Sequence, residues 1–82
     1  MKDISGFQNL VARADQLIRL KATGTSKEFA AKLGISRASE VRLLRDLRNI
    51  GAPIKYCRYR KTYYYEYAVK IEISFKILIV KE

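Results

Sequence analysis

The sequence predicts a small α+β domain in which three helices precede a β-hairpin and one further strand. Between residues 6 and 50, apolar side chains recur every three or four positions, which is typical of helices that bury one face. After Pro53 the apolar spacing changes to every second position, which is typical of strands. The chain has 82 residues, so we expect one domain that spans residues 1–82.

The first helix is expected over about residues 6–22. Ser5 and Gln8 have the spacing of a capping box, in which each side chain satisfies a free backbone amide at the start of a helix. Gly24 is expected to end the helix by adopting a left-handed conformation. The apolar residues of this segment share roughly one helical face: Phe7, Leu10, Val11, Ala14, Leu17, Ile18 and Leu20.

Two further helices are expected over about residues 26–33 and 37–50. Thr25 and Glu28 have the spacing of a second capping box, and Ser36 is a favourable N-cap for the third helix. A turn of three residues, beginning with a glycine, separates the two segments. This is the layout of a helix-turn-helix motif.

The third helix has an apolar arc and a polar arc. The apolar arc contains Val41, Leu43, Leu44, Leu47 and Ile50. The polar arc contains Ala38, Ser39, Arg42, Arg45, Asp46 and Asn49. Arg48 lies near the edge of the apolar arc and is expected to lay its stem over the core. Glu40 falls inside the apolar arc, where its carboxylate either reaches water past the rim or pairs with a cation.

Strands are expected over about residues 54–60, 63–67 and 69–79. The first two are rich in tyrosine, and Lys61 and Thr62 separate them, so we interpret them as a hairpin. The last strand alternates apolar and polar side chains and is too apolar on one face to stand alone in water. It either adds to the hairpin sheet or pairs with another chain, which makes a homodimer through this strand an expectation.

The composition argues against an enzyme. The chain has no histidine and one cysteine, Cys57, so it can build neither a Ser-His-Asp nor a Cys-His arrangement, nor a typical zinc site. We therefore expect no enzymatic activity, no metal, no cofactor and no small-molecule ligand. The longest apolar run is residues 77–80, and no export signal is visible, so we expect a cytoplasmic protein that is not in a membrane.

The charge predicts a polyanionic partner. Lys and Arg number 17 against 8 Asp and Glu, for a net charge of +9. The excess is concentrated between Arg37 and Lys61, where basic residues far outnumber Glu40 and Asp46. Such a concentration favours DNA or RNA, although a basic surface that only keeps the chain soluble is an alternative.

Residues 14–65 resemble a known family. The pieces that carry the resemblance are D-Q-L-I at 15–18, T-G-T at 23–25, E-x-A-x-x-L-G-I-S at 28–36, L-x-x-L-R at 44–48 and G-A-P-I-x-Y at 51–56. In this order and spacing they are similar to the winged helix-turn-helix head of bacterial DeoR-type and WYL-associated transcription regulators. The ligand-sensing domain that follows in such regulators has no counterpart in these residues, so the resemblance implies no effector.

The resemblance implies sequence-specific binding of double-stranded DNA by a small transcription regulator. The third helix would enter the major groove, and the hairpin, or wing, would lie along the backbone or minor groove. The residues that would contact DNA are Lys27, Arg37, Ala38, Ser39, Arg42, Arg45, Arg58, Arg60 and Lys61. The sequence departs from the family pattern at Glu40, where an apolar residue is usual, at Leu43, where Asp is frequent, and in the wing turn, which has no glycine.

Two other functions follow from the same sequence. A protein-interaction module would use the last strand to add to a partner's sheet. An RNA or single-strand binder would stack unpaired bases on the tyrosines of residues 56–67. The structural alternative for those tyrosines is that one set packs over the first and third helices while another set pairs across the hairpin.

Overall fold

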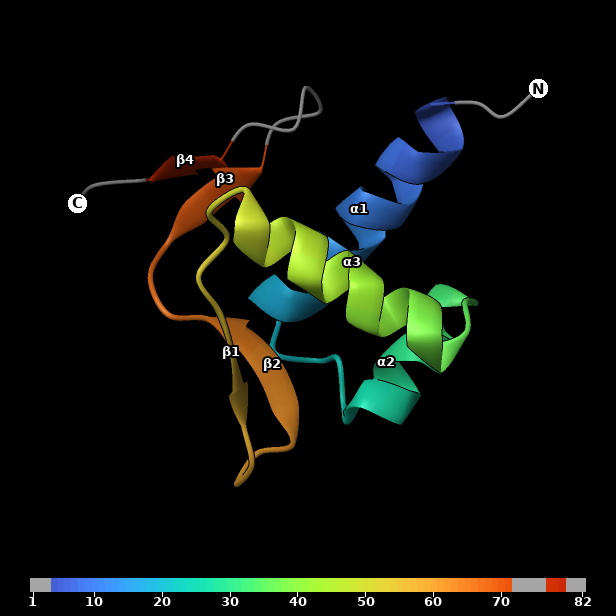
Figure 1. The fold of residues 1–82 in the computed structure, drawn as a ribbon. Coiled ribbons are helices and arrows are strands. Elements are labelled where there is room, and N and C mark those ends of the chain that lie inside the picture. The colour runs from blue at the N-terminus through green and yellow to red at the C-terminus, as the bar shows by residue number, and fades with distance from the viewer. Residues whose placement is uncertain (1–3, 72–76, 80–82) are drawn as a thin grey trace.

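The computed structural model describes residues 4–71 and 77–79. Over these residues the chain forms three helices followed by two antiparallel two-stranded sheets (Figure 1). The helices are α1 (Ile4–Arg19), α2 (Ser26–Leu33) and α3 (Arg37–Asn49). The strands are β1 (Ile54–Cys57), β2 (Thr62–Tyr65), β3 (Val69–Ile71) and β4 (Ile77–Ile79). The predicted α+β class, with three helices before a hairpin, is confirmed.

Both predicted ends of α1 are wrong. The helix begins at Ile4, so Ser5 lies inside the helix and is not its N-cap. At the other end the helix stops at Arg19, and the left-handed residue next after it is Lys21, with φ 55°. Gly24 does adopt the expected positive φ, 74°, but it lies too far along the chain to end the helix. The amide of Ala22 donates to the carbonyl of Leu17 over 2.9 Å, which is the hydrogen bond that closes a Schellman motif.

The predicted starts of α2 and α3 are confirmed. The amide of Thr25 donates to Glu28 Oε1 over 2.8 Å, and the amide of Glu28 donates to Thr25 Oγ1 over 3.3 Å, so the capping box is complete. The amide of Ser39 donates to Ser36 Oγ over 3.0 Å, which caps α3. Gly34 ends α2 with φ 73°, a conformation that costs glycine little. These local signals fix the turn between the two helices.

The hairpin is shorter than predicted, and its turn lies elsewhere. Cys57 pairs with Thr62, which leaves residues 58–61 as the loop and places Thr62 inside β2. Lys61 supplies the positive φ, 54°, that the sequence did not provide through glycine or asparagine. The tip of this hairpin extends away from the helices at the bottom of Figure 1.

The single strand predicted over residues 69–79 is wrong. The structure instead contains two short strands, with Val69 opposite Ile79 and Ile71 opposite Ile77 in antiparallel register. An antiparallel pair requires the chain to reverse direction between its strands, which a continuous strand cannot do. The sequence did not reveal this, because apolar and polar residues alternate with the same two-residue period from the first short strand to the second. Residues 72–76, which the prediction included, lie outside the described residues.

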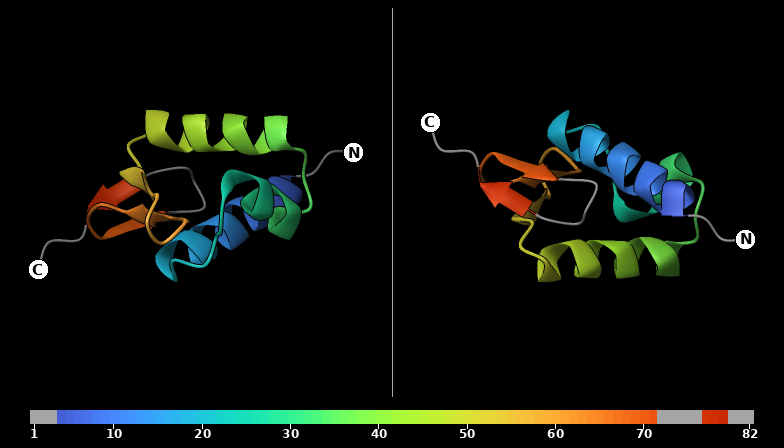
Figure 2. Two further views of the ribbon diagram at one scale, coloured as in Figure 1. Left: turned by 90° about the horizontal axis from the view of Figure 1, so that it is seen from below. Right: turned by 90° about the horizontal axis from the view of Figure 1, so that it is seen from above.

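The core lies between α1 on one side and α3 on the other (Figure 2). Its centre is Phe29 of α2, whose side chain is fully buried. Two residues of the predicted apolar arc of α3 are exposed instead: Val41 by 53% and Ile50 by 41%. The other members of the core are Val11, Ala14, Ile18, Leu33, Leu43, Leu44, Leu47, Ala52 and Ile54.

Two buried threonines join the loop before α2 to the hairpin. Thr23 and Thr62 are 39 positions apart, yet their Oγ1 atoms are 3.1 Å from each other. Thr23 Oγ1 also accepts a hydrogen bond from the amide of Tyr63 over 2.8 Å, and the amide of Thr23 donates to Thr62 Oγ1 over 3.3 Å. The pair therefore supplies partners to two backbone amides at the place where the hairpin meets the helices.

Replacing Thr23 with valine is expected to lower the free energy of unfolding by about 1–3 kcal/mol, because the amide of Tyr63 is left without its acceptor in the interior. The side chain keeps its shape, so packing changes little. Urea unfolding followed by circular dichroism measures the effect. Ala31→Ser, on the exposed side of α2, is the control and should cost no more than about 0.5 kcal/mol. A Thr23→Val protein as stable as the control would contradict this role.

Candidate nucleic-acid interface

The outward face of α3 is exposed and basic. Burial of Glu40, Leu43, Leu44 and Leu47 fixes the inner side of the helix. At 100° per residue, the side chains on the opposite side must face solvent. Arg37, Ala38, Arg42 and Arg45 are exposed, whereas Ser39 is half-buried at the edge of the face. Both views of Figure 2 show α3 at one side of the molecule, with the other described helices and strands all on its inner side.

The three arginines differ in what holds them. Arg37 Nε donates to Ser26 Oγ of α2 over 3.0 Å. Arg45 Nε lies 3.8 Å from Asp46 Oδ1, and both side chains are more than half exposed, so this ion pair is weak. Within the described part of the chain, Arg42 has no hydrogen-bond or ion-pair partner. Arg42 and Arg45 can therefore both turn toward an external anion.

The hairpin tip carries the second group of exposed basic residues. Arg58, Arg60 and Lys61 are all exposed, and Tyr59 between them is 94% exposed. The amide of Arg60 donates to Cys57 Sγ over 3.3 Å, which contributes to closing the loop. The sequence placed these residues at or near the tip, and the structure agrees. Lys27, the second residue of α2, is also exposed.

The tyrosines of residues 56–67 differ in burial: Tyr63, Tyr64 and Tyr65 are half-buried, whereas Tyr56, Tyr59 and Tyr67 are exposed. Tyr63 and Tyr65 pack against the core. The ring of Tyr63 lies 5.5 Å from the ring of Phe29 and 4.8 Å from that of Tyr56 on the opposite strand. The expectation that one set of tyrosines packs over the first and third helices while another pairs across the hairpin is met in part. Tyr63 and Tyr65 pack against the core, but the cross-strand ring pair joins Tyr56 to Tyr63, so the two sets are not separate. Tyr59 is left as the aromatic side chain at the tip.

Glu40 follows neither of the two expectations. Its side chain is fully buried, and its Oε1 accepts a hydrogen bond from Ser26 Oγ over 2.6 Å. Its Oε2 has no hydrogen-bond partner among the described residues. The carboxylate thus reaches neither water nor a cation directly, because a serine on α2 lies between Glu40 and Arg37. The sequence could flag Glu40 as unusual, but no local pattern named Ser26 as its partner.

Arg48 links α3 to the hairpin. It is exposed, and its Nε donates to the carbonyl of Ile54 over 3.1 Å. That its stem lies over the edge of the core stays a prediction, and the hydrogen bond to β1 was not foreseen. This contact makes Arg48 a structural residue and separates it from the freely exposed arginines of α3.

Tyr65 connects the hairpin to α1. Its hydroxyl donates to Asp15 Oδ1 over 2.6 Å, and the guanidinium of Arg19 lies 5.6 Å from its ring centre. Burial, together with the hydrogen bond to Asp15, raises the pKa of Tyr65 well above its usual value. In the unfolded chain this phenol loses its proton near pH ~10, whereas in the folded chain it keeps it. Stability from this contact is therefore present below about pH 10 and is lost as pH rises further.

The free energy of unfolding should therefore fall less steeply above about pH 10 in Tyr65→Phe than in the unmodified protein. Urea midpoints measured from neutral to alkaline pH test this. Tyr59→Phe removes an exposed phenol and should keep the slope of the unmodified protein. If the free energy of unfolding fell equally steeply with pH in all three proteins, folding would not raise the pKa of Tyr65.

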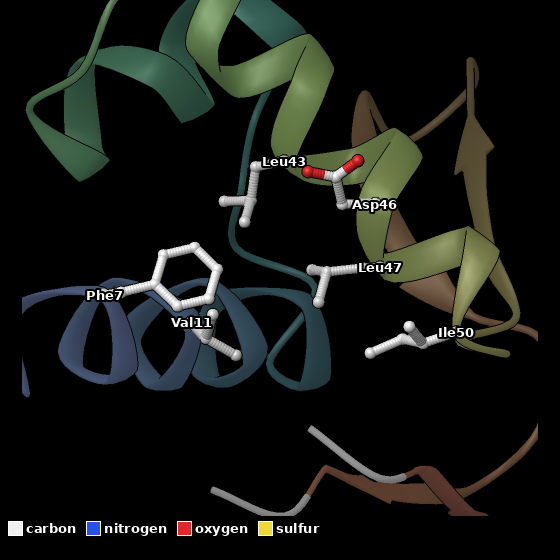
Figure 3. A pocket seen from close by; sticks show the side chains of 6 residues that line it. All are labelled: Phe7, Val11, Leu43, Asp46, Leu47 and Ile50. Carbon is white, nitrogen blue, oxygen red and sulfur yellow. The ribbon is translucent and has the colours of Figure 1, made fainter. Parts of the chain in front are cut away.

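A shallow pocket of about 190 Å³ lies between α1 and α3, with mostly apolar walls (Figure 3). Phe7, Val11 and Leu47 project into it, and Asp46 is the one charged residue among the described residues that line it. One carboxylate among apolar side chains offers no pair of groups for acid–base chemistry. Over residues 4–71 and 77–79, no three metal-ligating side chains gather in one place. None of the described helices has both the length and the apolar character needed to cross a membrane.

Comparison of the chain with protein-family models, with curated proteins and with solved structures finds no match. The case for a function therefore depends on the site itself. The candidate contact residues lie on three parts of the fold: the outward side of α3, the hairpin tip and the start of α2. We call these residues the basic face: Lys27, Arg37, Ala38, Ser39, Arg42, Arg45, Arg58, Arg60 and Lys61.

Proposed function

We propose that this chain binds double-stranded DNA in a sequence-specific manner and acts as a small transcription regulator. α3 lies in the major groove, and the β1–β2 hairpin tip contacts the backbone. The observation that carries the proposal is the exposure of Arg37, Arg42 and Arg45 on a helix whose outer side is not covered by any other described element. A helix fits the major groove, and guanidinium groups recognise both phosphate and guanine.

The two helices of the motif support the same proposal. α2 and α3 are both capped at their first turns, and a tight turn after Leu33 holds them together. The start of the second helix of such a pair is the part that reaches base edges. Here it carries Arg37, Ala38 and Ser39. Arg42 and Arg45 follow along the exposed side, where phosphates of the groove walls lie in range.

A salt series with random duplex DNA tests the proposal. If about five phosphates are neutralised, the logarithm of the association constant should fall with the logarithm of salt concentration, with a slope of roughly −4 to −5. Fluorescence anisotropy of a labelled duplex measures the constant. A slope near zero, or no binding at low salt, would rule the proposal out. Preference for a single strand in competition would instead favour RNA or single-strand binding.

The alternative of a protein-interaction module concerns β3 and β4. These strands form a sheet that shares no strand pairing with β1–β2 in the described part of the chain, so an open edge is available to a partner. Deleting residues 69–82 should then abolish self-association while leaving DNA affinity per chain nearly unchanged. Val69 is buried, so a melting curve must accompany the deletion. A deletion that only unfolds the domain would remove support for this alternative.

A further inference from the structure

Ser26 lies between a buried carboxylate and the first arginine of α3. Its Oγ donates to Glu40 Oε1 over 2.6 Å and accepts from Arg37 Nε over 3.0 Å. Arginine can only donate, so Ser26 Oγ accepts from Arg37, and its single hydroxyl proton is free to go to the carboxylate of Glu40. The three side chains form one directed chain of hydrogen bonds that runs from the protein surface into the core.

The inner end of this chain is held firmly. Glu40 is fully buried. Among the described residues, its carboxylate accepts one hydrogen bond, which comes from Ser26 Oγ. A buried carboxylate that loses its donor bears the full cost of desolvation, so this hydrogen bond is costly to break. Ser26 is the first residue of α2 and Glu40 lies one turn beyond Arg37 on α3. These hydrogen bonds therefore join the start of α2 to the first turn of α3, across the turn between the two helices.

The outer end of the chain orients Arg37. Because Nε is bound to Ser26, the guanidinium keeps its two Nη groups for an external partner. Two donors side by side match the O6 and N7 acceptors of guanine in the major groove. A side chain already held in one orientation loses less conformational entropy on binding than a free one.

We propose, on the premise that the chain binds duplex DNA as above, that Ser26 and Glu40 are positioning residues that hold Arg37 for one guanine of the target. Arg37 is the specificity-determining residue, and the other two act through it. Neither Ser26 nor Glu40 belongs to the basic face, and a direct contact of Glu40 with DNA is prevented by its burial. The side chain of Arg42 is not held by a hydrogen bond from another described residue. It contacts phosphate and does not discriminate between bases.

The test begins with selection of a target site from a random duplex pool. Affinity is then measured for the selected site and for the same site with each guanine replaced in turn. In the unmodified protein one replacement should cost about tenfold or more. Arg37→Ala should lose the preference at that position, and Ser26→Ala should reduce it by about three- to tenfold, because the guanidinium is no longer held.

Three control variants separate positioning from folding. Ser26→Thr keeps a hydroxyl and should keep the guanine preference. Ser26→Ala combined with Glu40→Leu removes both partners, leaves no orphaned carboxylate and should stay folded, yet it should reduce the guanine preference by as much as Ser26→Ala does. Arg42→Ala should weaken binding to every sequence equally and keep the preference. Melting curves show that each protein is folded.

The outcomes distinguish this inference from the proposed function. If the folded double variant keeps the full guanine preference, Arg37 does not need the hydrogen-bond chain and the inference is wrong, while duplex binding stands. If Arg37→Ala leaves every base preference unchanged, the inference is also wrong. If the unmodified protein shows no salt-dependent affinity for duplex DNA, the proposed function fails and the inference fails with it.

Discussion

Alanine at both Arg42 and Arg45 is expected to weaken binding to random duplex DNA by about 50-fold at about 0.1 M salt. Each arginine that neutralises a phosphate contributes about 0.9 to the salt slope, so two lost contacts lower the slope by about 1.8. Arg42 has no partner among the described residues, and Arg45 has only its weak ion pair with Asp46. The substitutions should therefore alter binding while the fold stays intact.

A matched control is available on the opposite side of the molecule. Ala12→Glu with Gln16→Glu changes the net charge by the same amount, and both positions are exposed on α1. Figure 2 shows α1 on the side away from the outer face of α3. The control should keep nearly all the affinity, since screening weakens charges more than about 10 Å from the DNA. Equal losses for the two proteins would mean that overall charge, and not the face of α3, drives binding.

Phe29→Ala is expected to lower the free energy of unfolding by about 3–5 kcal/mol. Phe29 is fully buried, and its ring meets that of Tyr63 at 5.5 Å, so α2 and the hairpin both depend on it. A domain of 82 residues has a total stability of only about 4–12 kcal/mol. The variant should therefore lose a large part of its stability and unfold at much lower urea concentration than the unmodified protein.

Two comparison variants make this prediction specific. Phe29→Leu fills most of the space and should cost clearly less than the alanine variant. Phe7→Ala removes the same ring from a position that is 45% exposed, and it should also cost clearly less. If Phe29→Ala and Phe7→Ala lowered the urea midpoint equally, Phe29 would not be the centre of the core.

The helical half of the fold could be predicted closely from the sequence. The limits of α2 agree at both ends, and α3 differs from its prediction by one residue. Thr25 with Glu28, and Ser36, signal the helix starts through side chains that bond amides only three positions away. Such short-range contacts can be predicted from the order of neighbouring residues. The exposure of the predicted arginines followed from the same periodicity, whereas their binding to DNA stays a prediction.

The C-terminal half was predicted less well because its pairing is not local. An alternating pattern fits one long strand and two paired short strands equally, and register decides between them. The partner of Ile54 is Tyr65, and the position of the turn follows from that register rather than from a glycine. Lys61 accepts a positive φ because the strands on either side require it.

By itself the sequence determined the order of three helices and a hairpin, the caps of α2 and α3, and the basic outer side of α3, because each depends on residues within a few positions of one another. Only the tertiary structure decided that Thr23 meets Thr62 and that Ser26 joins Glu40 to Arg37. These contacts bring together residues far apart in the chain, and packing selects them. No pattern of neighbouring residues specifies which buried polar groups will satisfy one another.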